Sequence, residues 1–336
     1  MNSGIKKSYL NFIERDHRGL IECILYKILC GFSFIYGFIV NIRNLAYDFR
    51  ILPSKSVEAK VISVGNLSWS GSGKTPLSIW LFEKFKNEKK TAILRRGYGK
   101  DENQLLKEEV ESVFISKDRY TKALEKQANF ELFILDDGFQ HRRLKRDIDI
   151  VIMGSREFNK KFRLIPAYFF REPLSSLKRA DIVLISHSDE IKDLSSVNDL
   201  ILSMVVSKNL FFSHYEIKGF FDLDGQEKNI DYFKDKPIAA FAAIGYPEGF
   251  FNKLTKAGLK LAKKITYPDH HQLNQLEFNQ LEDELLRKGI NNLIITRKDK
   301  YHLPNLERKI NIFIMEIRIV ISDEKRFFEE IRSRLN

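Results

Sequence analysis

The sequence predicts an α/β protein with two domains, the first built on a mainly parallel sheet with helices on both faces. Its 336 residues suggest two domains at roughly 150 residues each. Apolar runs also alternate with helical stretches such as Pro76–Lys86 and Arg119–Lys126, which is typical of parallel sheets covered on both faces. The runs expected to be strands of the first domain are Val61–Val64, Ala92–Leu94, Val113–Ile115, Leu132–Leu135, Ile148–Met153 and Ile182–Ile185.

The N-terminal 50 residues are expected to form a membrane-associating helical region. Leu20 to Val40 are mostly apolar, with Glu22 and Lys27 as interruptions. The uncharged stretch Ile28–Ile42 would span about 22 Å as a helix, which is short against a hydrocarbon core of about 30 Å. A helix lying at an anionic membrane surface is favoured by the basic residues near this run, which are Lys6, Lys7, Arg15, Arg18 and Lys27. The alternative is a buried first helix of the globular domain.

The remaining domain boundaries follow from a change of pattern near residue 211. Residues 51–210 are expected to form the first domain, residues 211–225 a β-hairpin linker, and residues 226–336 a smaller α/β domain. In the linker, a glycine separates two short β-prone runs. The second domain is expected to contain strands at Ile238–Ala242, Leu293–Thr296, Ile310–Met315 and near Ile265, with helices at Pro247–Ala257, Gln275–Arg287 and Glu324–Leu335.

Composition points to an anionic partner. The chain has 56 Lys plus Arg against 45 Asp plus Glu, a formal net charge of +11. Such a surplus suits nucleic acid, an acidic lipid surface or a phosphorylated substrate, and charge does not choose among them. The two cysteines, Cys23 and Cys30, have no metal-ligand spacing and make no disulfide framework.

A glycine-rich turn lies between the expected strand Val61–Val64 and the helical pattern Leu77–Phe85. Strand, turn and helix are the context of a phosphate-binding loop, in which backbone N–H groups and a helix N-terminus face phosphates. Lys74 would reach the outer phosphates and Thr75 would bind Mg²⁺. The consensus wants a glycine where Ser68 stands; the alternative is an ordinary glycine turn. The expected nucleotide-binding residues are Ser68, Trp69, Ser70, Gly71, Ser72, Gly73, Lys74 and Thr75.

Two carboxylates follow a second apolar strand. Phe133–Leu135 leads into Asp136 and Asp137, which would lie at the carboxyl end of the strand, where α/β sheets bind ligands. These side chains could hold Mg²⁺ directly or through water. The alternative is an acidic turn after an edge strand.

Histidines and arginines elsewhere are weaker signals. In Pro268-Asp269-His270-His271, an imidazole beside a carboxylate could accept a proton, although the residues alone favour a surface loop. The arginines of Arg95-Arg96-Gly97-Tyr98-Gly99 and of Arg171-Glu172-Pro173 could neutralise phosphate charge, but each run taken alone is typical of surface charge.

These motifs occur together in one family. The chain resembles the tetraacyldisaccharide 4′-kinases, the lipid A 4′-kinases of Gram-negative bacteria, from about Asn44 to Leu303. DDGFQHR together with REPL is highly specific to this family, whereas the phosphate loop alone is not. The matching stretches are VGNLSWSGSGKTP, RRGYG, DRY at 118–120, FILDDGFQHRRLKRDIDI, IPAYFFREPLSSLKRADIVLI, YPDH at 267–270 and TRKD at 296–299.

The resemblance implies transfer of the ATP γ-phosphate to the 4′-hydroxyl of a tetraacylated glucosamine disaccharide 1-phosphate. It implies ATP and Mg²⁺ as cofactors and a place at the cytoplasmic face of the inner membrane. It also implies a P-loop NTPase-like domain, a smaller α/β domain joined by a β-hairpin linker, and an N-terminal helix that touches the membrane. No nucleic acid and no obligate protein partner are expected.

The resemblance also assigns roles by position. Lys74 is matched to the phosphate-binding lysine, and His270 to the histidine of a catalytic Asp-His pair. Asp101, in a Lys-Asp-Glu-Asn run, is the expected partner of His270, although the stretch before it is shorter than in the family. If Asp101 does not reach the site, Asp269 or Asp137 would assist His270. The other assignments are metal and nucleotide residues Thr75, Asp136, Asp137, Gln140 and Glu172, and substrate-binding residues Asn66, Arg96, Arg119, His141 and Arg171.

Two other classes of protein compete with a lipid kinase. A P-loop ATPase or GTPase switch is one, but the Asn-Lys-x-Asp run of GTP-specific switches is missing and Arg297-Lys298-Asp299 is only a partial match. A nucleic-acid-binding protein is the other, since 27 Phe and 12 Tyr could stack on bases. No RNP-like or helix-turn-helix signature supports it.

Overall fold

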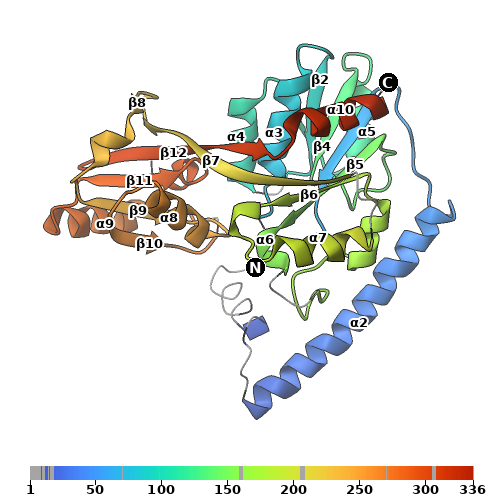
Figure 1. Cartoon of the computed structure of the whole chain (residues 1–336), viewed down its shortest axis with the longest axis horizontal. Coiled ribbons are helices and arrows are strands. Elements are labelled where there is room, and N and C mark those ends of the chain that lie inside the picture. Colours follow the sequence, from blue (N-terminus) through green and yellow to red (C-terminus); the bar gives the residue numbers. More distant parts are fainter. Residues whose placement is uncertain are drawn as a thin grey trace. The chain divides into compact units, whose positions relative to one another are not determined.

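The computed structural model describes residues 9, 12–13, 15, 19–69, 71–97, 99–158, 162–204, 209–269, 271–304 and 308–335. The chain divides into two compact units. The described residues of the P-loop unit lie within 9–97, 106–214 and 319–335, and those of the C-terminal unit within 99–105 and 215–318. The predicted α/β class with a mainly parallel sheet and a smaller second α/β domain is confirmed (Figure 1).

The sheet of the P-loop unit has the order β3-β2-β4-β1-β5-β6-β7, and all of its pairs are parallel. Four of its strands are buried along their whole length, which explains why they read as continuous apolar runs. The strands are β1 (Lys60–Gly65), β2 (Thr91–Arg95), β3 (Val113–Ile115), β4 (Leu132–Asp136), β5 (Ile148–Gly154), β6 (Ile182–Ser186) and the start of β7 (Leu210–Asp222).

Helices cover both faces of this sheet because alternate strand residues point to opposite sides. On β5, Ile150 and Ile152 share a core cluster with α3 (Lys74–Phe85) and α10 (Glu324–Leu335). Val151 and Met153 belong to the opposite cluster, which includes α7 (Leu194–Leu202). Other helical segments of the unit include α5 (Arg119–Lys126), α6 (Ser155–Phe158), η1 (Leu174–Arg179) and η2 (Ser188–Glu190).

The last helix, α10, corrects one predicted boundary. The sequence placed all of residues 226–336 in the C-terminal domain, whereas residues 319–335 belong to the P-loop unit. Phe327 lies 5.6 Å from the Trp80 ring and 5.0 Å from Phe211 between centroids. Lys84 pairs with Glu324 at 2.6 Å. The apolar stripe of α10 therefore completes the core next to α3.

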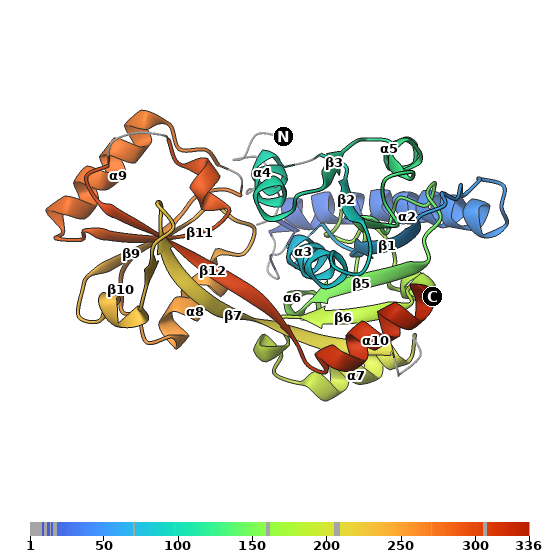
Figure 2. The same cartoon turned by 90° about the horizontal axis from the view of Figure 1, so that it is seen from above.

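The C-terminal unit has its own sheet, ordered β10-β9-β11-β12-β7. Its faces are covered by α8 and α9, which Figure 2 shows on opposite sides of the strands. Phe241 packs with the cluster of α9, while Ala240 and Ala242 pack with that of α8. The elements are η4 (Ile230–Phe233), β9 (Ile238–Ala242), α8 (Pro247–Lys256), β10 (Leu261–Thr266), α9 (Gln275–Arg287), β11 (Asn292–Thr296), η5 (Asp299–His302) and β12 (Asn311–Ile321).

Three elements run from one unit into the other. They are β7, β12 and α4 (Lys100–Glu109). The predicted linker over residues 211–225 is mostly one 13-residue strand, β7, rather than two short runs. After a turn at residues 222–225, the chain forms β8 (Glu227–Lys228), which pairs antiparallel with β7.

The long helix α2 (Leu20–Asp48) buries mainly small and polar residues and exposes most of its large apolar ones. Its buried residues, Ser33, Gly37, Val40 and Asn44, are spaced four, three and four apart and form one face. Ser33 Oγ donates to the Leu164 carbonyl at 2.8 Å, which fixes this face on the P-loop unit. The exposed apolar residues include Leu20, Ile21, Ile24, Leu25, Ile28, Phe32, Phe34, Ile35, Phe38, Ile39, Ile42 and Leu45.

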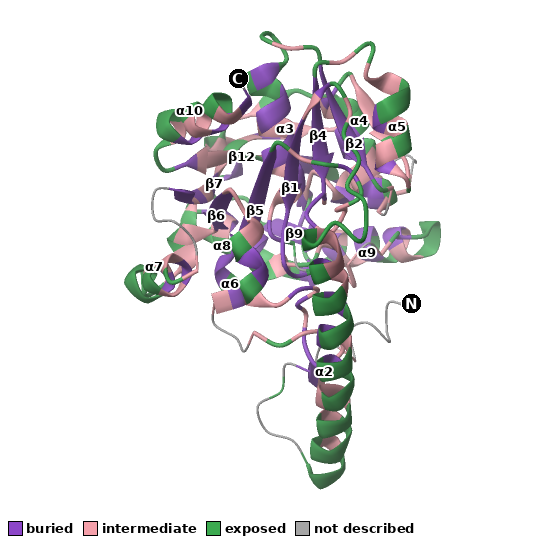
Figure 3. Ribbon diagram, turned by 90° about the vertical axis from the view of Figure 1, so that its right-hand side faces the viewer, coloured by how far each residue is buried: buried purple, intermediate pink, exposed green. Residues whose placement is uncertain are grey.

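This pattern contradicts the alternative of a buried first helix. Figure 3 shows most of α2 exposed. With 29 residues, α2 also has the length and apolar composition that crossing a membrane requires, in contrast to the short span expected from the uncharged stretch alone. One apolar N-terminal helix is thus available for association with a membrane.

Candidate active site

The phosphate loop connects β1 to α3, as the sequence predicts. Gly73 has a φ of 89°, in the left-handed region that glycine adopts without strain, and α3 begins at the next residue. Ser72 Oγ accepts from Asn66 Nδ2 at 2.9 Å, and its carbonyl accepts from Ser186 Oγ at 2.8 Å. These bonds hold the loop against the ends of neighbouring strands. Trp69 is partly exposed, and Ser70 lies outside the described residues.

Ser68, the departure from the phosphate-loop consensus, has a structural role. Its side chain is fully buried, and Oγ donates to Glu157 Oε1 at 2.6 Å. Glu157 is itself buried on α6. A glycine at position 68 would remove this donor from a buried carboxylate, which costs roughly 1–3 kcal/mol. Glu157 was not predicted, and no local sequence signal links it to the loop.

Thr75 and Asp136 meet at the carboxyl ends of the central strands. Asp136 is the last residue of β4 and is fully buried. Its Oδ2 accepts from Thr75 Oγ1 at 3.3 Å, and its Oδ1 accepts from Ser78 Oγ at 3.2 Å. A hydroxyl plus one carboxylate suits Mg²⁺, which usually takes waters and substrate phosphate oxygens at its other positions. These two residues therefore fit the predicted metal.

Arg95 joins the same cluster, although only its neighbour Arg96 was assigned a role in substrate binding. It ends β2, directly opposite Asp136 in the parallel register. Its guanidinium pairs with the Asp136 carboxylate, and Nη1 also donates to Thr75 Oγ1 at 3.3 Å. Arg96, the other arginine of this motif, is exposed. Successive side chains of a strand point to opposite faces of the sheet, and this alternation distinguishes Arg95 from Arg96.

Asp137 forms a second cluster of charges. It has a φ of 58°, unusual outside glycine, and accepts from Arg171 at 2.8 and 3.1 Å. Lys74 Nζ lies 3.8 Å from its carboxylate, and Arg119 donates to its carbonyl at 2.7 Å. Burial by itself would raise the pKa of Asp137, but Lys74, Arg171 and Arg119 together lower it well below its usual range. So acidic a carboxyl is a poor proton acceptor, which argues against Asp137 as a partner of His270.

Gln140 and His141 lie beside these clusters. Gln140 Nε2 donates to the Asn66 carbonyl at 2.9 Å, and Arg171 also donates to Asn66 Oδ1. Burial and the charge of Arg119 lower the pKa of His141 to about 4. His141 is thus neutral at pH 7, and its ring can accept or donate a hydrogen bond without adding charge.

Glu172 does not join Asp136 and Asp137. Its carboxylate is 1% exposed and accepts from Asn44 Nδ2 at 3.0 Å and Arg179 Nη2 at 2.6 Å. Within the described part of the chain, no group of three or more His, Cys, Asp or Glu side chains is placed to hold a metal ion. The structure therefore gives Glu172 a contact with α2 in place of the predicted shared metal cluster.

Of the two residues predicted to form the catalytic Asp-His pair, the structure describes only Asp101. His270 lies outside the described residues. Asp101, in the first turn of α4, is 5% exposed, and its Oδ2 lies 3.6 Å from His302 Nε2. His302 was not predicted, because nothing in the sequence near Asp101 indicates it.

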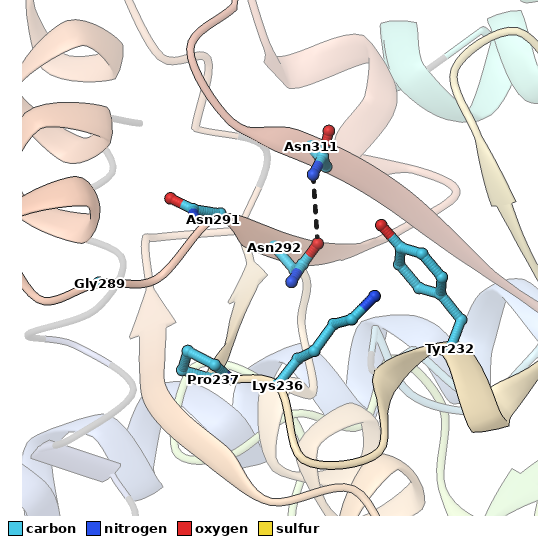
Figure 4. Close-up of a pocket in the computed structure, with 7 residues that line it drawn as sticks. All are labelled: Tyr232, Lys236, Pro237, Gly289, Asn291, Asn292 and Asn311. Atoms are coloured by element: carbon cyan, nitrogen blue, oxygen red, sulfur yellow. Dashed lines mark hydrogen bonds between the residues drawn. The ribbon is translucent and has the colours of Figure 1, made fainter.

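A separate cavity of about 260 Å³ lies at the amino ends of the C-terminal strands (Figure 4). Asn311 Nδ2 donates to Asn292 Oδ1 at 3.4 Å at one side of it. Its lining contains no carboxylate or imidazole for acid-base chemistry: Tyr232, Lys236, Pro237, Gly289, Asn291, Asn292 and Asn311. The cavity is therefore a weaker candidate for catalysis than the phosphate loop.

Comparison with known proteins decides the family. A family model described as tetraacyldisaccharide-1-P 4'-kinase matches residues 25–336. The chain belongs to this family. The resemblance predicted from the motifs is thereby confirmed, and the family's activity is that of a kinase.

Similar proteins cover nearly the whole chain. A tetraacyldisaccharide 4'-kinase of Halothermothrix orenii is 29% identical over 95% of this chain and 95% of its own length. One from Aquifex aeolicus is 31% identical over 90% of this chain and 97% of its own. The crystal structure of Aquifex aeolicus LpxK in complex with ATP has a TM-score of 0.73 at 29% identity, and covers 93% of this chain and 100% of that one.

Proposed function

We propose that this chain transfers the γ-phosphoryl group of ATP to the 4′-hydroxyl of a tetraacylated glucosamine disaccharide 1-phosphate. The observation that carries the proposal is that Thr75 contacts Asp136 and Lys74 contacts Asp137 in a chain of this kinase family. The Aquifex aeolicus relative in complex with ATP supports ATP as the donor. A P-loop ATPase or GTPase switch is not favoured, because the family match extends from residue 25 to the end of the chain.

The chemistry follows from where negative charge develops. Mg²⁺, when bound, would supply positive charge that offsets the negative charge of the transferring phosphoryl group. Thr75 and Asp136 would hold the ion, while Lys74 and the backbone N–H groups at the start of α3 bind the outer phosphates. Arg171 and Arg119 lie at Asp137 and add positive charge for anionic groups. His270, with Asp101 as its partner, is proposed to remove the proton of the sugar hydroxyl.

The direct test of the proposal follows phosphate from γ-labelled ATP. Purified protein is mixed with ATP, Mg²⁺ and tetraacyldisaccharide 1-phosphate, and label should move into the lipid fraction. Label that appears only as free phosphate, at the same rate without lipid, would identify a hydrolase and contradict the proposal. Omission of Mg²⁺ should abolish the transfer.

We also propose that α2 binds the cytoplasmic face of the inner membrane. Its exposed apolar side faces away from the bonds that hold Ser33 and Asn44. The net charge of +11 would add attraction to anionic lipids. A lipid substrate would then be reached from the surface that contains it.

Replacement of two exposed phenylalanines should weaken membrane binding. Phe34 and Phe38 are 79% and 61% exposed, so Phe34→Asp combined with Phe38→Asp should leave folding unchanged. Burial of one Phe contributes roughly 1.5–3 kcal/mol, so binding should fall at least about tenfold. Sedimentation with vesicles containing anionic phospholipid measures this. Leu276→Asp, at a 67% exposed residue of α9, is the matched control and should bind like the wild type. Equal binding by both variants would contradict the assignment of α2.

A further inference from the structure

A buried charge cluster in the C-terminal unit lies at Asp101. The His302 ring lies between two carboxylates, with Nδ1 3.1 Å from Asp299 Oδ1 and Nε2 3.6 Å from Asp101 Oδ2. The three side chains are 2%, 0% and 5% exposed in the order His302, Asp299, Asp101. Such burial makes an uncompensated charge costly, so the three groups depend on one another.

Asp299 already has donors from the protein backbone and from a hydroxyl. Ala243 N–H donates to its Oδ1 at 2.9 Å, and Thr296 Oγ1 donates to its Oδ2 at 2.6 Å. These bonds fix Asp299 at the end of β11 and orient the imidazole through Nδ1. The other ring nitrogen, Nε2, is thereby directed at Asp101.

A second ion pair joins the same two elements. Lys298, just before η5, pairs with Glu102 of α4. Two successive residues of the first turn of α4 thus contact two residues at η5. Asp269 also raises the pKa of Lys298, after Glu102 and Asp101, while burial alone would lower it. Asp269 therefore lies close enough to Lys298 for their charges to interact.

These residues lie at one edge of the C-terminal sheet. Residue 243 follows β9, residue 269 follows β10, and η5 follows β11. The three strands are parallel, so their carboxyl ends share that edge, where open α/β sheets bind ligands. The contacts of His302 with Asp101 and of Lys298 with Glu102 bring Asp101 to this edge, although α4 follows none of these strands.

The charge state of His302 favours a lasting ion pair between His302 and Asp101. Burial by itself would lower the pKa of His302, but Asp101 and Asp299 raise it to about 9. The ring is thus an imidazolium at neutral pH. The charged groups around it are Asp101 and Glu102 on α4, Asp299 and Lys298 at η5, and Asp269 after β10.

We propose that His302 is a positioning residue, which holds Asp101 at the carboxyl edge of the C-terminal sheet for the role of Asp101 in phosphoryl transfer. The inference rests on the proposed role of Asp101 beside His270. His302 itself is not assigned a contact with substrate.

The kinetic test replaces His302 by glutamine. His302→Gln removes the positive charge, so kcat for lipid phosphorylation should fall about 10–100-fold, the usual cost of losing a partner that orients a reacting group. KM for ATP should stay within about twofold of the wild type. His302→Lys restores a cation and should recover most of kcat. The control is His187→Gln, which alters a histidine of the P-loop unit that lies 3.6 Å from Glu190.

A second measurement does not depend on activity. NMR of ¹⁵N-labelled imidazoles should show one histidine, absent from His302→Gln, that titrates near pH 9. Because the folded pKa exceeds the unfolded value of about 6.5, the stabilisation is complete below that value and is lost as pH rises through about 9. The difference in unfolding free energy between wild type and His302→Gln should shrink over that interval.

The outcomes separate the two proposals. A His302 midpoint near 6.5, or a kcat for His302→Gln equal to that of His187→Gln, would overturn the positioning role. If the variant loses stability but keeps kcat, the pair is structural only and the proposal also fails. If the wild type transfers no phosphate to lipid, the proposed function fails, and the NMR titration still decides whether the ion pair exists.

Discussion

Lys74→Ala should reduce kcat about 10³–10⁵-fold, the range for loss of a cation at a transferring phosphoryl group. Lys74 lies in the first turn of α3, where its ammonium would bind the outer phosphates. Negative charge in the transition state is spread over the phosphate oxygens, so removal of this cation acts on the phosphoryl-transfer step. Stability should change by about 1 kcal/mol or less, because the pair of Lys74 with Asp137 is 3.8 Å long and partly exposed.

The comparison with the base residue sharpens this prediction. A positioned base contributes roughly 10²–10⁴-fold, so His270→Ala should retain more activity than Lys74→Ala. Single-turnover kinetics at saturating ATP and lipid measure both. Lys84→Ala is the matched control, since Lys84 is on the same helix and pairs with Glu324 on α10. Comparable residual rates for Lys74→Ala and His270→Ala would show that electrostatic stabilisation by Lys74 is not the larger effect.

The Asp136→Leu variant should unfold at a much lower denaturant concentration than the wild type, and it should also lose activity. Asp136 is fully buried and pairs with Arg95, which is 6% exposed. Removal of one partner leaves the other charge buried without compensation, which costs about 3–5 kcal/mol. Kinase activity should disappear with the carboxylate that is proposed to hold Mg²⁺.

The double variant distinguishes charge from shape. Arg95→Met combined with Asp136→Leu removes both charges, so most of the lost stability should return while activity does not. Urea denaturation followed by circular dichroism measures the stability of all three proteins. Ser78→Ala is the control, because it removes only the 3.2 Å hydrogen bond to Asp136 and should cost about 1 kcal/mol. A double variant no more stable than Asp136→Leu would show that the ion pair is not the source of the effect.

The sequence by itself determined the features that are local in the chain. The central strands of the first domain are recognisable because they are buried on both faces, which requires a continuous apolar run. The phosphate loop is recognisable because β1, the turn and α3 are consecutive. The end of β4 at Asp136 was equally local. The class of sheet and the nucleotide loop are therefore encoded in consecutive residues.

Only the tertiary structure decided which distant side chains meet. Arg95, and not the exposed Arg96, reaches Asp136 because β2 and β4 pair in one register. Glu172 turns to Asn44 because α2 docks on the P-loop unit. Asp101 meets His302, 201 positions along the chain, through the packing of α4 on η5. Such partners are determined by how the elements pack. A buried ion pair is stabilised by the contact of its two charges, and this contact produces no periodic pattern in the sequence.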